Sequence, residues 1–247
     1  MALALAAATA AHGTDTVVVD ADTYGGSLAQ LLSVLDEVSG LVAACRTVNQ
    51  GRSHQVVEQL LDIDPQLRLL TGLPRADMWT QVRPGALDVV LSQLRLASDL
   101  VVVDCGFCLE PGSAPGQGRN QTALQVLDLA DAVVVVGKPD PVGLSRLIRG
   151  LHDLREVVTT PIIVVNQMRP SLGWGEREVR STVLRLTGQQ PAVFLPLDQP
   201  GVDLAVMNGR SAREAVPSSP FVARVEGLTT AVMDAVSPRA VLAAADT

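Results

Sequence analysis

The chain has 247 residues, of which 47% are apolar and 2% aromatic, and its formal net charge is −7. This length and apolar content allow a sizeable core, and the acidic balance argues against a generic nucleic-acid or anionic-membrane surface. Three cysteines in a chain of this size do not form a disulfide framework, which favours a reducing, cytoplasmic compartment. No apolar run reaches the ~20 residues of a membrane span.

The chain opens with MALALAAATAAHG, a run of small apolar residues that ends at Gly13. A secretion signal has positive charge ahead of its apolar stretch, and this run has none. The strand-like TVVVD at 16–20 follows directly. We therefore interpret the opening as a helix stopped by Gly13 inside a domain, with a secretion signal as the alternative.

Short, continuous apolar runs alternate with helical patterns along the rest of the chain. The predicted strands are 16–20, 67–71, 100–104, 132–136, 161–166 and 192–195. The predicted helices are 55–61, 84–97, 121–129, 141–157, 176–186 and 220–236. Runs of this kind suit strands buried on both faces, and the alternation predicts a doubly wound, mostly parallel α/β sheet flanked by helices.

We expect a single domain over 1–236 and a disordered tail over 237–247. The segment 110–120, EPGSAPGQGRN, has the composition of a mobile loop.

Acidic residues follow two of the predicted strands, where ligands bind in open α/β sheets. In VVVDADTYGGSL, Asp20 and Asp22 stand one residue apart as the strand becomes a loop. Carboxylates at such a place hold Mg²⁺ through its waters or orient an attacking water. The alternative is that both are merely solvated, or cap a helix that begins near Ser27.

In LVVVDCGFC, the four apolar residues and Asp104-x-Gly106 have the form of a Walker B strand and switch, in which the Asp serves the Mg²⁺ shell and the Gly amide senses the γ-phosphate. The alternative is any buried strand that ends in a turn. The same stretch holds a C-x-x-C motif, Cys105 and Cys108. A redox pair of this kind needs its first Cys at a helix N-terminus, whereas here both lead into a loop, so a thiol oxidoreductase is a minor hypothesis.

Lysine occurs once in the chain, at Lys138, in VVVVGKPDP. This stretch is no phosphate loop, because the G-x-x-x-x-G-K-[ST] pattern is absent and Pro139 lacks an amide proton. We expect Lys138 to be an exposed residue in a strand-to-helix turn.

Five stretches in register resemble the MinD/ParA group of P-loop ATPases and, within it, the CpaE/TadZ-like proteins of pilus assembly and polar positioning. They are ALALAAATAAHG, VVVDADTYGGSL, DLVVVDCG, ADAVVVVGKPDPVGLSRL and PIIVVNQMRP. In order, they resemble the helix after the phosphate loop, switch I, Walker B with switch II, the next strand–helix unit, and the strand that bears the adenine-side Asn. SGLVAACR and LRLLTGL also resemble the CpaE-like branch, in which actinobacterial-type proteins are often labelled septum-site determining.

The resemblance implies roles for four residues of the first half. Asp22 would position the attacking water, with Asp20 beside it near the metal. Asp104 would serve the Mg²⁺ shell, and Gly106 would sense the γ-phosphate.

Three residues of the second half would contact the nucleotide. Asn166 would hydrogen-bond the adenine, while Pro196 and Asp198 would lie along the base. The implied ligands are therefore ATP and Mg²⁺, and the implied enzyme is an ATPase.

The family's first strand and its KGGxGKT loop are not found in this sequence. We expect a start codon placed too late, a fragment, or a descendant that has lost the loop, and we expect poor ATP binding by the chain as printed. In the family the missing strand lies in the middle of the sheet, so its neighbours would have unpaired edges.

Two function hypotheses follow from the resemblance. The first is an ATP-dependent homodimer that recruits protein partners of the division, polarity or pilus/secretion machinery, at the septum or pole. The second is a non-hydrolysing scaffold of the same fold, and whether ATP is hydrolysed stays open. The end of the chain, PRAVLAAADT, has no cationic face, which argues against direct membrane anchoring. Three arginines along 146–155 are interpreted as a solvated face rather than a DNA-binding surface.

Overall fold

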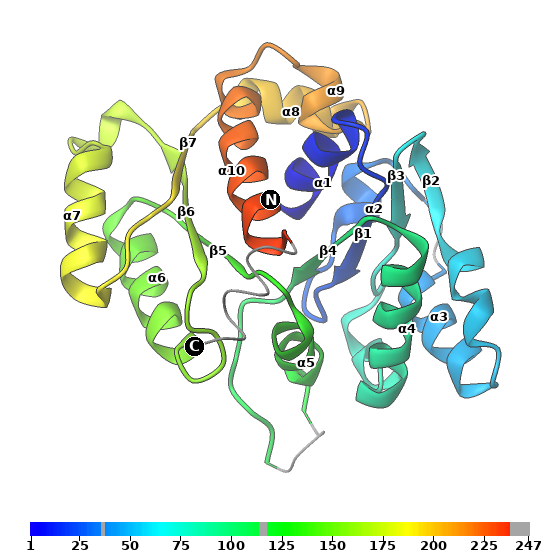
Figure 1. Ribbon diagram of the computed structural model, residues 1–247. Helices are drawn as coiled ribbons and strands as arrows, with labels where there is room; N and C mark the ends of the chain where they lie inside the picture. The colour runs from blue at the N-terminus through cyan, green and yellow to red at the C-terminus, as the bar shows by residue number, and fades with distance from the viewer. Residues whose placement is uncertain (36–37, 114–117, 238–247) are drawn as a thin grey trace. The chain divides into compact units, whose positions relative to one another are not determined.

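The computed structural model describes residues 1–35, 38–113 and 118–237 (Figure 1). These residues form two compact units. The first comprises Met1–Leu129 and Leu204–Ala215, and the second comprises Ala130–Asp203 and the chain from Val216 onward. Each unit has its own sheet, so the two are described in turn.

The first unit contains a four-stranded sheet in the order β2-β3-β1-β4. Its strands are β1 (Thr16–Ala21), β2 (Leu61–Asp64), β3 (Leu67–Leu70) and β4 (Leu100–Cys105). The central strand β1 pairs in parallel with β3 and with β4, and β2 adds to β3 as an antiparallel edge. Among the described strands, β4 pairs with β1 alone.

The helices of the first unit begin with α1 (Ala2–Ala11), which ends at His12 before Gly13, whose φ is +86°. This left-handed glycine is the helix stop predicted from the sequence. The other helices are α2 (Leu28–Leu31), α3 (Gly40–Asn49), α4 (Pro84–Ala97), α5 (Gln121–Leu129) and α9 (Ala212–Ala215), with 3₁₀ turns at Ser53–Gln59 and Ala76–Gln81. Helix α8 (Gln199–Met207) spans the boundary between the units.

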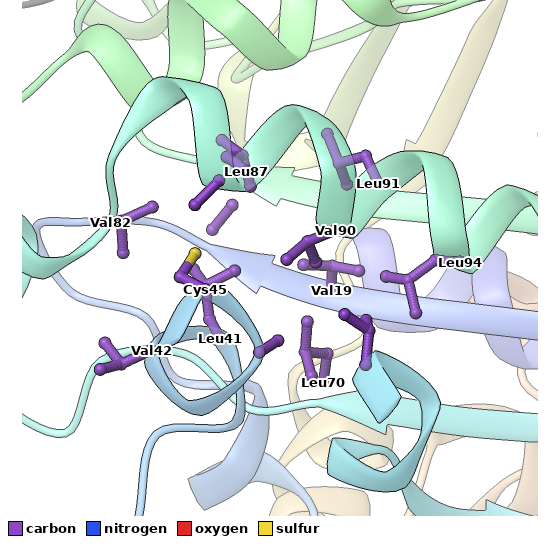
Figure 2. Packing of buried hydrophobic residues seen from close by; sticks show 14 of the residues in the cluster. Val19, Leu41, Val42, Cys45, Leu70, Val82, Leu87, Val90, Leu91 and Leu94 are labelled. Carbon is purple, nitrogen blue, oxygen red and sulfur yellow. The ribbon is translucent and has the colours of Figure 1, made fainter. Parts of the chain in front are cut away.

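One face of this sheet carries the core of the first unit. Figure 2 shows Val19 of β1 and Leu70 of β3 packed against side chains of α3 and α4, among them Leu41 and Val90. These four side chains are fully buried. Strand alternation then turns the intervening residues of β1, Val18 and Asp20, to the opposite face.

The second unit contains three parallel strands in the order β5-β6-β7: β5 (Val134–Gly137), β6 (Ile162–Met168) and β7 (Val193–Pro196). Helices α6 (Pro141–Leu154) and α7 (Glu176–Thr187) pack on the sheet through a cluster that includes Leu147, Val179 and Phe194, and α10 (Pro220–Val236) contacts β6 and β7. A 3₁₀ turn lies at Pro170–Leu172. Within the described strands, β5 pairs with β6 alone.

The predicted fold class is confirmed: the protein is α/β, with mostly parallel strands flanked by helices. All six predicted strands are present, and α4, α5 and α10 have the predicted bounds. The helix predicted over 55–61 is wrong, because a 3₁₀ turn ends at Gln59 and β2 begins at Leu61. Lys138 is exposed between β5 and α6, as expected.

Several expectations are not tested by the structure. The single-domain assignment and the two unpaired strand edges expected of a missing central strand stay predictions. Residues 114–117 of the expected mobile loop, and 238–247 of the expected tail, lie outside the described residues. No helix in the described part of the chain is long and apolar enough to cross a membrane.

Candidate functional site

Two carboxylates stand side by side where β1 and β4 end. The parallel register pairs Asp20 with Asp104, and the pairing continues through Ala21 and Cys105. Because Val17, Val19 and Ala21 face the α3–α4 core, the alternation turns Asp20 to the other face, and the register places Asp104 beside it. Sequence analysis predicted both acids at strand ends, and the structure brings them together.

Asp20 is enclosed by backbone. Its side chain is 1% exposed, and its two oxygens accept hydrogen bonds from the amides of Leu28 (3.0 Å) and Asp22 (3.3 Å). A Cβ on Gly26 would lie 2.5 Å from Asp20 Oδ1, and one on Gly72 would lie 2.6 Å from Asp20 Cγ. Only glycine therefore fits at these two positions while the carboxylate keeps its place. The bond to Leu28 at the start of α2 matches the capping alternative raised for this residue.

Burial raises the pKa of Asp20 from its ordinary value of 3.8 to about 6. The two amide hydrogen bonds oppose this rise, and the negative charges of Asp104 and Asp22 add to it. Burial is also the main cause that raises the pKa of Asp104, helped by Asp22 and opposed by the positive α-amino group of Met1. Negative charge at this end of the sheet is thus poorly compensated.

Asp22 and Gly106 meet just beyond the strands. The Asp22 carboxylate accepts a hydrogen bond from the Tyr24 amide at 2.8 Å, which fixes the loop after β1 as an Asx turn. A Cβ on Gly106 would lie 2.9 Å from Asp22 Oδ1. The four residues predicted from the first half of the chain therefore form one cluster.

The two cysteines of the C-x-x-C motif lie at the same end of the sheet. Burial raises the pKa of the Cys105 thiol to about 12, and the charges of the neighbouring acids, Asp104 first, add to the effect. Cys105 and Cys108 are free thiols. A reactive thiol needs a lowered pKa, so these surroundings are the opposite of what the oxidoreductase hypothesis requires at Cys105.

The cluster fits a hydrated magnesium ion better than a directly bound one. Within the described ranges, no group of three or more His, Cys, Asp or Glu residues has the arrangement of a metal site. Both Asp20 oxygens are already engaged by amides, which leaves Asp104 and Asp22 to contact the waters of the ion. The printed sequence has no G-x-x-x-x-G-K-[ST] loop to cradle phosphates.

The predicted residues of the second unit lie at the ends of β6 and β7. Asn166 Oδ1 accepts a hydrogen bond from the Gln167 amide at 2.8 Å, and Gln167 has a left-handed φ of 67°. Pro196 is the register partner of Met168. Asp198 accepts hydrogen bonds from the Gly201 amide (3.1 Å) and from the Ser219 hydroxyl.

Both Asp198 oxygens are thus used inside the second unit, where they hold the starts of α8 and α10. The proposed contacts of Asn166, Pro196 and Asp198 with a nucleotide base stay predictions.

Three residues were not singled out from the sequence: Tyr24, which contacts the cluster through its amide, and Arg119 and Asn120, which contact Tyr24. Tyr24, Arg119 and Asn120 join the loops after β1 and β4 through side-chain hydrogen bonds. Tyr24 is the one tyrosine of a chain poor in aromatics, which was an available signal. Asn120, the partner of its hydroxyl, lies 96 positions away in sequence, a separation that no local pattern reveals.

Comparison with solved structures identifies the fold. The chain is similar to a ParA family ATPase from Chlorobium tepidum (TM-score 0.76, 17% identity, 93% of this chain and 91% of that chain). It is also similar to the septum site-determining protein MinD with Mg-ADP from Pyrococcus horikoshii (TM-score 0.69, 16% identity, 94% of this chain and 88% of that chain). A third similar structure is the MinC:MinD cell division protein complex of Aquifex aeolicus (TM-score 0.70, 15% identity, 94% of this chain and 88% of that chain).

No family model matches the sequence, and no curated protein matches it. The protein therefore has the fold of the ParA and MinD ATPases, a fold it shares at low sequence identity.

Proposed function

We propose that this protein is a positioning switch of the MinD/ParA type, from the CpaE/TadZ-like branch, which recruits protein partners at the septum, the pole or a pilus/secretion apparatus. The observation that carries the proposal is the cluster of Asp20, Asp22, Asp104 and Gly106 at the ends of two adjacent parallel strands. These residue types, in a fold similar to nucleotide-bound MinD, support binding of a nucleoside triphosphate with magnesium.

In this proposal each residue has one task. Asp104 would contact the water shell of magnesium, and Asp22, held by the Tyr24 amide, would orient a water. The buried carboxylate of Asp20 holds the turn from which Asp22 projects, since Asp20 bonds the Asp22 amide. Bound magnesium would supply charge neutralisation for the phosphates and for these acids.

We also propose that the 247 residues alone bind Mg·ATP poorly, because they lack a phosphate cradle and contain a single lysine. This supports the second candidate, a non-hydrolysing scaffold with the same partner surface. In that case association of two copies does not depend on nucleotide.

Two measurements separate these candidates. Calorimetric titration with Mg·ATP is expected to show no micromolar binding, and micromolar binding that is lost in Asp104→Asn would exclude the scaffold. Sedimentation velocity then reports mass with millimolar Mg·ATP or Mg·ADP. A nucleotide-driven switch becomes a dimer with Mg·ATP only, whereas a scaffold keeps one mass throughout.

The positioning role is tested separately in cells. A fluorescent fusion of the chain is expected to concentrate at the septum or a pole, and a uniform cytoplasmic signal through the division cycle contradicts the role. The Cys105→Ser/Cys108→Ser double variant is expected to localise normally. Loss of localisation in a folded double variant would revive the oxidoreductase hypothesis.

A further inference from the structure

The loop after β1 is tied to the segment before α5 by reciprocal hydrogen bonds. The Thr23 hydroxyl donates to the carbonyl of Arg119 (3.2 Å), and the Arg119 guanidinium donates to the carbonyl of Thr23 through Nε (3.1 Å) and Nη2 (2.6 Å). The same guanidinium lies 4.0 Å from the centre of the Tyr24 ring. Thr23 is 4% exposed, so water competes little for these bonds.

Asn120 extends this connection to the loop after β4. Its Oδ1 accepts a hydrogen bond from the Tyr24 hydroxyl at 2.7 Å. Its Nδ2 donates to Cys108 Sγ (3.2 Å) and to the carbonyl of Glu110 (2.8 Å). Asn120 directly precedes α5, where Asn is a favoured helix cap, yet these three bonds all go to groups outside that helix.

The aromatic rings add a second contact between the loops. The centre of the Phe107 ring lies 5.3 Å from that of Tyr24, with the planes tilted by 44°, although Phe107 is 85% exposed. Tyr24 therefore contacts three residues from two parts of the chain: Phe107 after β4, and Arg119 and Asn120 before α5. Its own amide holds the Asp22 carboxylate.

We propose that Arg119 and Asn120 form a latch with Tyr24 that couples the loop after β1 to the loop after β4, and that they are positioning residues for Asp22. The latch acts through Tyr24, whose backbone amide fixes Asp22 and whose side chain is held by the other two. A change in either loop is then felt in the other. This inference deepens the proposed function, because Asp22 is the water-orienting residue there.

The thiol of Cys108 reports on the latch without any nucleotide. Asn120 covers this sulfur with a hydrogen bond, whereas Cys45 is buried in the core and burial raises the pKa of Cys105. Pulsed alkylation with iodoacetamide, read cysteine by cysteine by mass spectrometry, gives the rate at Cys108. We expect Asn120→Ala to raise it about fivefold, the change for the loss of about one hydrogen bond.

The decisive variant is Tyr24→Phe, which keeps the ring and removes only the hydroxyl that bonds Asn120. If the latch couples the loops, this change raises the Cys108 rate about threefold, and it has no further effect in an Asn120→Ala background. Asn208→Ala is the matched control, since its side chain makes one local bond, to the carbonyl of Leu204. A Cys108 rate unchanged in folded Tyr24→Phe, or additive effects in the double variant, would overturn the latch.

Failure of the latch and failure of the proposed function give different results. Altered Cys108 rates in a chain whose mass never responds to Mg·ATP keep the latch and favour the scaffold over the nucleotide-driven switch. Unaltered rates in a chain that does respond to Mg·ATP contradict the latch and keep the switch. Melting curves for every variant show that the rates refer to folded protein.

Discussion

Polar residues end the parallel strands of both units, but the two units treat them in opposite ways. In the first unit, Asp20 and Asp104 lie side by side, and burial raises the pKa of each. In the second unit, Asp198 accepts hydrogen bonds from the Gly201 amide and the Ser219 hydroxyl. The ends of β1 and β4 thus bring carboxylates together, whereas the carboxylate that follows β7 holds the starts of two helices.

An acid at the end of a parallel strand is therefore only a starting hypothesis for a site. What distinguishes the first unit is neighbouring carboxylates, two glycines that admit Asp20, and burial that raises the pKa of Asp20 and Asp104 although the Met1 amino group opposes the rise at Asp104. Crowded, desolvated acids of this kind are costly to the fold and mark candidate functional sites. The second unit shows how a similar residue becomes an ordinary helix cap.

The largest expected effect comes from closing the space that admits Asp20. In Gly72→Ala, the new methyl would lie 2.6 Å from Asp20 Cγ and 2.9 Å from its backbone oxygen, so the strand end must shift. We expect the free energy of unfolding to fall by about 3 kcal/mol, measured by urea denaturation. Gly85→Ala is the control, because a Cβ there meets no atom within 4 Å, and its effect is expected to stay within about 1 kcal/mol. Equal losses in the two variants would contradict this account of the glycine.

The second prediction concerns pH and the charge of Asp20. The folded protein holds a proton on Asp20 with a pKa of about 6, above the ordinary value of 3.8, so folding favours the protonated form. The stabilisation is fully present below pH 3.8 and is lost as the pH rises through 6. The total change is at most about 3 kcal/mol.

Asp20→Asn removes this titration, and its difference in unfolding free energy from the native chain cancels the groups that do not interact with Asp20; the charge of Asp104, which adds to the rise at Asp20, stays part of the difference. Urea denaturation at a series of pH values is expected to show the native chain losing stability relative to the variant between about pH 4 and pH 6. A difference that stays flat over this range would show that Asp20 keeps an ordinary pKa.

How far the fold follows from local sequence differs between elements. Continuous apolar runs predicted strands covered on both faces; β1 is buried along its whole length, whereas β4 over Leu100–Cys105 is a strand that is mostly half-buried. β2 was missed because Leu61-Asp-Ile-Asp64 is an alternating edge strand whose acids are exposed, and it follows a short turn that resembles a helix end. α3 was missed because its Gly, Val, Thr and Asn residues are poor helix formers, and its stability comes from the Ser39 cap and from burial in the core.

The candidate site likewise contains residues that local sequence predicts and contacts that only tertiary packing creates. Asp20, Asp22, Asp104 and Gly106 were predictable, because the ends of adjacent parallel strands meet at one edge of a sheet. The space that Gly72 leaves for Asp20 and the bond from Tyr24 to Asn120 were not. These contacts join positions 52 and 96 apart in the chain, and only the packing of β3 beside β1 and of α5 against β4 brings them together.

The smallest expected effect concerns the second unit, where Asp198 and Ser219 hold the start of α10. Ser219 begins α10, accepts hydrogen bonds from the amides of Phe221 (3.0 Å) and Val222 (3.5 Å), and donates its own proton to Asp198. Ser219→Ala leaves these amides and one Asp198 oxygen without that partner, so the free energy of unfolding is expected to fall by about 1–2 kcal/mol. The control is Ser181→Ala, at an exposed position inside α7, where alanine's helix propensity should raise stability by a few tenths of a kcal/mol. Urea denaturation of both variants makes the comparison, and a Ser219→Ala variant that loses no stability would mean that water replaces the cap. In that case the bond from the Gly201 amide would be the structural contact left to Asp198, and its other oxygen would be available for the expected contact with a nucleotide base.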